Sequence, residues 1–222
     1  MEKIRRNRTK TIQRIVEALE DVITERGLEG VGVNRVAEKA GVSKVLIYRY
    51  FGGLDGLLEY YVKMGKLYPT FTPAVLEQIR PLNQSDLARI WYRQVTQTYR
   101  TFRTFKAGRE MLKATVIEGD VTADIISKAQ DEELVRLVDQ LSFVKGADVH
   151  AISAVMLSAM SHMTLLAQNN RTMIGIDLRS EDGWKRIEEA VKVIYIALNK
   201  VAAQSKETTV ELQTSATPVA LW

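Results

Sequence analysis

The chain has 222 residues, 46% of them hydrophobic and 26% charged, a composition typical of a globular protein with a sizeable core. It contains no cysteine, which excludes disulfide bonds and thiolate metal sites. The net charge of +4 arises in the first 51 residues, which hold 11 lysines and arginines against 7 acidic residues. The basic amino-terminal end is therefore the part of the chain suited to nucleic acid.

The first fourteen residues are the most basic stretch. Six lysines and arginines stand there with one acidic residue, which gives the stretch a net charge of +5. Such a stretch is usually a solvated, mobile arm, but next to a DNA-binding element it also suits the phosphate backbone. We take Arg5, Arg6 and Arg8 as candidate DNA contacts in this arm.

Residues 33–51 predict two short amphipathic helices joined by a sharp turn. The first helix has an apolar side, on which small Ala37 allows a second helix to cross closely. Gly41 supplies the positive φ that an abrupt helix end needs, and Ser43 is a good N-cap for the next helix. This is the pattern of a helix-turn-helix.

The second of these helices presents two different faces. At about 100° per residue, Ile47 and Phe51 fall on one face, whereas Val45, Tyr48 and Arg49 fall on the other. The residues at its leading end are Lys44 and Leu46. We expect the first face to pack and the second to meet a major groove and its phosphates. The alternative is a purely structural helix pair, as in many all-α proteins that never bind DNA.

A wider set of residues resembles one known family. From Ile12 to about Val62, the order and spacing of apolar and turn residues are similar to the DNA-binding domain of the tetracycline-repressor (TetR) family of bacterial regulators. The matching residues are Ile12, Ile15, Val16, Leu19, Val22, Ile23, Val36, Ala37, Gly41, Val42, Ser43, Lys44, Ile47, Tyr48, Tyr50, Phe51, Asp55, Leu57 and Leu58.

The resemblance implies which side chains contact DNA. Those positions are Lys44, Val45, Leu46, Tyr48 and Tyr50, with Asn34 on the preceding helix. We add Arg49 from its place on the outward face. Two positions depart from the family pattern: Val31-Gly32 stands where a threonine or serine usually opens the second helix, and Leu54 stands where a lysine is usual.

The rest of the chain predicts an all-α fold without strands or internal repeats. We expect helices over 85–104, 106–117, 122–143, 147–169 and 181–204, the last one capped by Ser180. Three prolines between residues 69 and 81 place a boundary near residues 66–73. The predicted parts are a helix-turn-helix DNA-binding domain (1–66), a larger helical ligand-binding and dimerisation domain (67–204) and a loose tail (205–222).

The last two predicted helices carry apolar seams with steps of three and four, as in coiled coils. Both also have apolar residues off the seam, such as Val155 and Val193, so each helix can bury two faces. A core helix of a monomer is the alternative. The TetR resemblance implies a homodimer formed by these two helices, and twofold symmetry predicts a palindromic operator in double-stranded DNA. The candidate interface residues are Ile152, Met156, Ala159, Met163, Trp184, Ile187, Val191, Ile194 and Leu198.

Residues 91–105 concentrate aromatic side chains. Core packing is one interpretation, and the wall of a cavity for a mostly apolar small molecule is the other. The candidate ligand-binding residues are Trp91, Tyr92, Val95, Tyr99, Phe102, Met111, Met160 and His162. We expect His162 to make a polar contact with either a ligand or a second copy of the chain. Two histidines without cysteine or a tight carboxylate cluster predict no metal site, and we expect no cofactor.

These patterns favour a ligand-responsive transcriptional regulator, with repression as the expected mode. The alternative is a DNA-binding regulator that answers to a protein partner or to no ligand. We expect no enzyme, because the sequence shows no catalytic triad, glycine-rich phosphate loop or metal constellation. With no apolar run of about 18 residues, we expect a cytoplasmic protein and no membrane partner.

Overall fold

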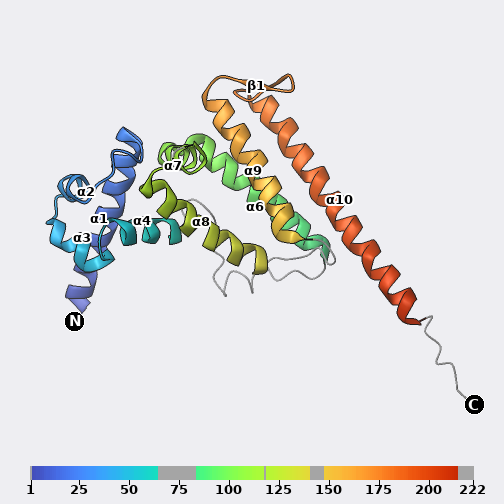
Figure 1. Ribbon diagram of the computed structural model, residues 1–222, viewed down its shortest axis with the longest axis horizontal. Helices are drawn as coiled ribbons and strands as arrows, with labels where there is room; N and C mark the ends of the chain where they lie inside the picture. The colour runs from blue at the N-terminus through green and yellow to red at the C-terminus, as the bar shows by residue number, and fades with distance from the viewer. Residues whose placement is uncertain (1, 65–83, 118, 141–147, 215–222) are drawn as a thin grey trace, which may run out of the picture. The chain divides into compact units, whose positions relative to one another are not determined.

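The computed structural model describes residues 2–64, 84–117, 119–140 and 148–214. These residues form helices and one two-stranded hairpin (Figure 1). The predicted all-α fold class is confirmed. The predicted boundary near residues 66–73 lies outside the described residues.

The first four helices make up the helix-turn-helix unit. They are α1 (Glu2–Arg26), α2 (Val33–Ala40), α3 (Lys44–Phe51) and α4 (Leu54–Lys63). α1 packs against α2, α2 against α3, and α3 against α4. Apolar side chains at helical spacing form the shared core, among them Ile15, Leu19, Ile23, Val36, Ile47, Leu57 and Leu58.

The basic stretch at the start of the chain is helical. α1 begins at Glu2, so the expected arm is a continuation of this helix. Residues 2–26 contain neither glycine nor proline, and nothing local interrupts the helix. The side chains of Arg5 and Arg6 lie outside the described residues, whereas that of Arg8 is described.

The remaining helices begin within two residues of their predicted starts. They are α6 (Gln84–Thr104), α7 (Lys106–Ile117), α8 (Val121–Gln140), α9 (Val149–Gln168) and α10 (Glu181–Thr214). α10 continues ten residues past its predicted end at residue 204. Residues 201–217 contain no proline or glycine to stop the helix. Residues 215–222 lie outside the described part.

A small hairpin joins α9 to α10. Strands β1 (Thr172–Met173) and β2 (Ile176–Asp177) pair antiparallel, and the two turn residues, Ile174 and Gly175, have φ values of 49° and 72°. Two positive φ values are characteristic of a tight hairpin turn. Sequence patterns did not predict these strands, because two residues are too few to show alternation. The Oγ of Ser180 then accepts a hydrogen bond from the Gly183 N–H at 2.9 Å, which confirms the predicted cap of α10.

The chain folds as two compact units. The first contains residues 1–70 and 98–136, and the second contains residues 71–97 and 137–222. Within the first unit α7 packs against α1, so the helix-turn-helix unit has a neighbour that lies outside the predicted 1–66 domain. The predicted domain limits stay predictions.

α9 is unusually apolar. By length and composition it is the one helix among the described residues that could cross a membrane, and 28% of its most apolar window is buried. It contains no charged residue, although serine, threonine and histidine interrupt the apolar run. Most residues in the apolar window of α9 are therefore not buried by the rest of the chain.

Gly108 of α7 allows two aromatic rings to approach the helix. A Cβ at this position would lie 2.8 Å from a ring carbon of Phe105 and 3.0 Å from one of Phe102. Phe102 is 1% exposed, and its ring centroid lies 5.6 Å from that of Tyr99. The buried Phe102 ring therefore has little room to move away.

We expect Gly108→Ala to lower the free energy of unfolding by about 1–2 kcal/mol, because overpacking outweighs the higher helix propensity of alanine. Urea unfolding followed by circular dichroism measures this change. Gly119→Ala is the control, since no atom lies within 4 Å of a Cβ there. Equal stability of the Gly108 variant and the wild type would contradict the packing argument.

Candidate nucleic-acid interface

The turn between α2 and α3 has the geometry that the sequence predicts. Gly41 ends α2 in the left-handed conformation, with φ at 62°. The Val42 N–H donates to the Ala37 carbonyl at 3.0 Å, which closes the helix end in a Schellman motif. The Oγ of Ser43 accepts a hydrogen bond from the Val45 N–H at 3.3 Å and caps α3. Both predicted caps are confirmed.

α1 holds this turn from outside. The Arg14 guanidinium donates to the carbonyl oxygens of Ala40 at 2.6 Å and Gly41 at 3.2 Å. Lys39, in the last turn of α2, forms an ion pair with Glu25 of α1. The hydrogen bond from Lys39 lowers the pKa of Glu25. Arg14 therefore supports the turn, a role that its place in the basic stretch did not indicate.

The other side of α1 meets α4. Burial, aided by the nearby Glu20 carboxylate, raises the pKa of the Tyr61 phenol far above its ordinary value. Tyr61 therefore stays neutral in the core at any physiological pH. Its ring is fully buried beside Leu57 and Leu58 on α4, which secures the helix that follows α3.

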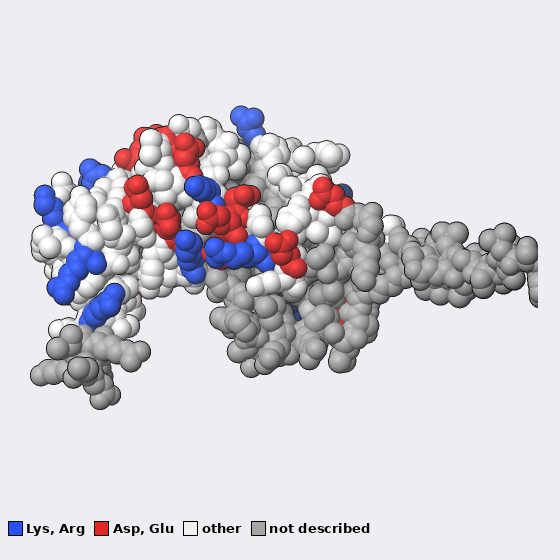
Figure 2. Space-filling view, turned by 60° about the horizontal axis from the view of Figure 1, so that its bottom comes forward, with Lys and Arg blue, Asp and Glu red and all other residues white. Residues whose placement is uncertain are grey.

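α3 exposes the face that the sequence assigned to DNA. Ile47 is fully buried, whereas Val45 is 63% and Tyr48 55% exposed. The other DNA-contact candidates divide by exposure: Lys44, Arg49 and Asn34 are exposed, and Leu46 and Tyr50 are half-buried. In Figure 2, lysine and arginine side chains mark the left end of the molecule, over helices α1 to α3.

The start of α1 borders α3 along one flank. The Cζ atom of Arg8 lies 5.4 Å from the centroid of the Tyr50 ring, within the range of a cation–π contact. A cleft of about 540 Å³ opens between the two helices, lined by Asn7, Arg8, Thr11, Leu46, Arg49 and Tyr50. Sequence reasoning missed Asn7 and Thr11. Continuation of the helix through residue 7 would have placed both on the same face as Arg8.

Several bacterial regulators are similar in sequence to a short part of this chain. It is 46% and 48% identical over 59 residues to the HTH-type transcriptional regulators BetI 1 and BetI 2 of Chromohalobacter salexigens. It is also 39% identical over 49 residues to an uncharacterised HTH-type transcriptional regulator of Mycobacterium tuberculosis. The match to each BetI regulator covers 27% of this chain and 26% of the relative.

Residues 15–61, which hold the turn and α3, match the bacterial regulatory proteins of the tetR family. The likeness in sequence to the tetR family thus covers the helix-turn-helix unit. The matched residues run from the buried half of α1 to Tyr61 on α4 and so include the whole helix-turn-helix core.

Solved structures extend the tetR likeness to the fold of most of the chain. The fatty acid degradation regulator FadR of Bacillus halodurans has a TM-score of 0.57 and 17% identity, covering 81% of this chain and 97% of that one. NalD of Pseudomonas aeruginosa, a secondary repressor of a multidrug efflux pump, has the same TM-score and identity, with coverage of 83% and 96%. A TetR transcriptional regulator of Rhodococcus has a TM-score of 0.52 and 18% identity, with coverage of 87% and 97%. At these identities the likeness shows the fold alone.

One departure from the tetR pattern has a structural counterpart. Gly32 is the N-cap of α2 and offers no side-chain hydrogen bond to the first turn. The capping hydrogen bonds of α2 are therefore at its carboxyl-terminal end, where the Gly41 N–H and the Arg14 guanidinium donate to the last carbonyl oxygens. Leu54, the second departure, is half-buried at the start of α4 and carries no charge for a phosphate.

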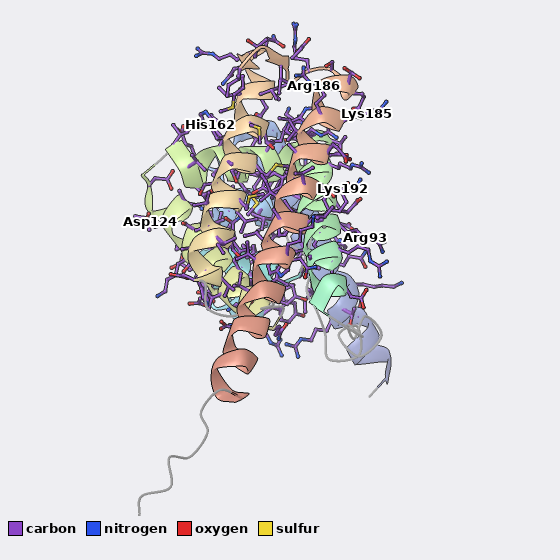
Figure 3. All side chains as sticks on the ribbon, turned by 90° about the vertical axis from the view of Figure 1, so that its right-hand side faces the viewer. Arg93, Asp124, His162, Lys185, Arg186 and Lys192 are labelled. Carbon is purple, nitrogen blue, oxygen red and sulfur yellow. The ribbon has the colours of Figure 1, made fainter. Side chains whose placement is uncertain are left out.

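The predicted ligand-binding residues are divided between the two units. Tyr99, Phe102 and Met111 are buried in the first unit, and Trp91, Val95 and Met160 are buried in the second, with Tyr92 half-buried there. His162 is exposed and points outward from α9 (Figure 3). This exposure does not agree with a place in the wall of an internal cavity.

The predicted dimer residues also divide by burial. Met156, Trp184, Ile187 and Val191 are at most 9% exposed, so each packs mainly within the chain. Ala159 and Ile194 are exposed, and Ile152, Met163 and Leu198 are half-buried. The first part of the α10 seam, from Trp184 to Val191, therefore packs within the chain, whereas Ile194 further along the seam and Val193 beside it are exposed.

We expect Arg14→Gln to lower the free energy of unfolding by about 1 kcal/mol, because it removes the charge-assisted hydrogen bonds to the end of α2. Urea unfolding measures this effect. Arg26→Gln, at the exposed other end of α1, is the matched control and should change stability by less than about 0.5 kcal/mol. Equal losses in the two variants would show that Arg14 has no special role at the turn.

Proposed function

We propose that this chain is a tetR-family, DNA-binding regulator of transcription. In this proposal it binds a palindromic operator as a homodimer, acts as a repressor and is released by a small, mostly apolar molecule. The observation that carries the proposal is the outward face of α3: Ile47 holds the helix in the core, while Val45 and Tyr48 are more than half exposed. An exposed valine and tyrosine flanked by cations suit a major groove better than they suit water.

Each exposed residue of α3 has a role that follows from its chemistry. Lys44 can donate to guanine, and Val45 and Leu46 offer apolar contacts to thymine methyl groups. Tyr48 and Tyr50 carry hydroxyl groups that can donate to phosphates, and Arg49 can reach either a phosphate or a base edge. The arginines at the start of α1 add charge to the same side of the unit.

Uncovered apolar residues on α9 and α10 support the homodimer. Figures 1 and 3 both show these two helices side by side. The exposed stripe of α10 consists of Ala190, Val193, Ile194, Ala197 and Val201, and the exposed stripe of α9 consists of Ala151, Val155, Ser158, Ala159 and His162. Both stripes recur at helical spacing, as expected of a helix that packs on a second helix. A second copy that covers them would also explain why such an apolar helix as α9 is little buried alone.

Buried aromatic residues on α6 support a ligand-responsive body. Trp91, Tyr99 and Phe102 lie on this helix with at most 4% of their surfaces exposed. A molecule that binds better to one arrangement of the two units than to another would change operator affinity by that preference. Control by a protein partner remains the alternative, and a native mass spectrum of the purified protein discriminates the two by the presence or absence of a small bound molecule.

Selection of duplexes from a random library should recover a palindrome with half-sites about one helical turn apart. On that duplex, fluorescence anisotropy should show affinity falling steeply with salt.

Tyr48→Phe should weaken binding to all sequences alike, since it removes one phosphate contact. Lys44→Ala should relax preference at one base step by about 1–3 kcal/mol.

Tyr60→Phe is the matched control for Tyr48→Phe, because Tyr60 is an exposed tyrosine on α4 whose hydroxyl has no role in the proposed interface and whose ring the change keeps. Its affinity should equal that of the wild type. Recovery of no sequence, or affinity that is insensitive to salt, would overturn the proposed function.

We expect Val193→Glu to convert the dimer to a monomer, because it places a charge in the centre of the exposed stripe of α10. Sedimentation velocity measures the change in mass. Val116→Glu is the matched control: this valine is 56% exposed on α7, close to the 57% of Val193, but lies outside both stripes. A wild-type monomer, or a dimer that survives the Val193 change, would contradict the proposed interface.

A further inference from the structure

We propose that the cleft between the start of α1 and α3 is a seat for one phosphate of the DNA backbone, gripped by Arg8 and Arg49. This inference rests on the proposed function and specifies a site within it. The site extends beyond the base-reading face of α3, because half of its lining comes from α1.

The lining of the cleft favours an anion. Its two charged residues, Arg8 and Arg49, are both cationic, and the other lining residues are Asn7, Thr11, Leu46 and Tyr50. The volume of about 540 Å³ is larger than one phosphate requires, so the adjoining sugars of a backbone strand can enter as well. The Thr11 hydroxyl donates to the Asn7 carbonyl one turn earlier on α1, at 2.9 Å.

The two arginines have no acidic partner among the described residues. Other basic residues of the same unit differ: Lys39 pairs with Glu25, and Lys63 lies 3.4 Å from Glu59. An unpaired guanidinium presents several N–H donors in a planar fork that matches two phosphate oxygens. Two such groups at one cleft make a phosphate the ligand that their chemistry fits best.

Aromatic contacts hold the cleft in shape. Arg8 stacks over Tyr50, which restrains the guanidinium while its edge remains able to donate. The Tyr50 ring meets Phe51 edge-on at 6.4 Å between centroids, and Phe51 meets Tyr60 of α4 at 5.2 Å. The seat is therefore braced from α1 through α3 to α4 before any DNA binds.

The position of the cleft around α3 also fits a backbone strand. Leu46 and Tyr50 lie on one flank of the helix, and Tyr48 lies about 200° from Tyr50 on the opposite flank. A helix in the major groove has a sugar–phosphate strand on each side. The cleft would then grip one strand, while Tyr48 meets the other.

Neutral methylphosphonate substitution tests the seat on the full-length protein. Each phosphate of the selected duplex is replaced in turn, and affinity is measured by fluorescence anisotropy. One position in each half-site should weaken wild-type binding about tenfold. At that position Arg8→Gln and Arg49→Gln should each lose less affinity on substitution than the wild type does, because each variant has already lost one of the two arginines that hold the phosphate.

The salt dependence gives a second readout. Each arginine variant should reduce the slope of log affinity against log salt by about 0.9 for every phosphate that the variant no longer neutralises. Arg26→Gln is the matched control, since it removes the same charge from α1 about 27 Å further along the helix and should leave the slope unchanged. Circular dichroism confirms that the variants are folded.

Two results would overturn the seat while leaving the proposed function intact: tight DNA binding with no sensitive phosphate, or arginine variants that behave like Arg26→Gln. Failure of the wild type to bind any duplex would overturn the proposed function itself. The methylphosphonate scan of the wild type needs no variant. It therefore tests for the phosphate seat even where a substitution disturbs folding.

Discussion

The burial of Ile47 is the constraint on which the rest of the structure depends. This side chain is fully enclosed in the core of the helix-turn-helix unit, and α3 has only eight residues. One anchored face on so short a helix determines which side chains face solvent. Gly41 and Ser43 set the angle between α2 and α3, and Arg14 of α1 donates hydrogen bonds to the same turn. The outward face of α3 is thus a consequence of packing rather than of its own polarity.

The same unit is joined to the rest of the chain by packing as well as by sequence. α7 lies against α1, whose opposite end carries Arg8 beside α3. α1 therefore contacts both α7 and α3 within the first compact unit. In our proposal, a change in the body that moves α7 would move α1 and with it the turn. The exposed stripes of α9 and α10 would fix the distance between two such units.

Local patterns predicted the fold well, and long-range contacts were beyond them. Glycine and serine at the turn, and apolar residues at helical spacing, act on neighbours within a few positions, so Gly41, Ser43 and Ile47 were predicted correctly. The contacts of Arg14 with Gly41 and of Arg8 with Tyr50 join residues 27 and 42 positions apart, which no local pattern reveals. Periodicity also could not tell which apolar face of α10 packs inside: Trp184 is buried, whereas Val193 is exposed.

The central claim is that two copies of α3, held at a fixed separation, enter successive major grooves on one side of a duplex. Changing the spacing between the half-sites of the selected operator tests it most directly. Insertion of five base pairs rotates one half-site by about half a turn and should lower affinity at least 100-fold. Insertion of ten base pairs returns both half-sites to the same side of the duplex and should recover part of the lost affinity. Affinity that is indifferent to spacing would contradict the account.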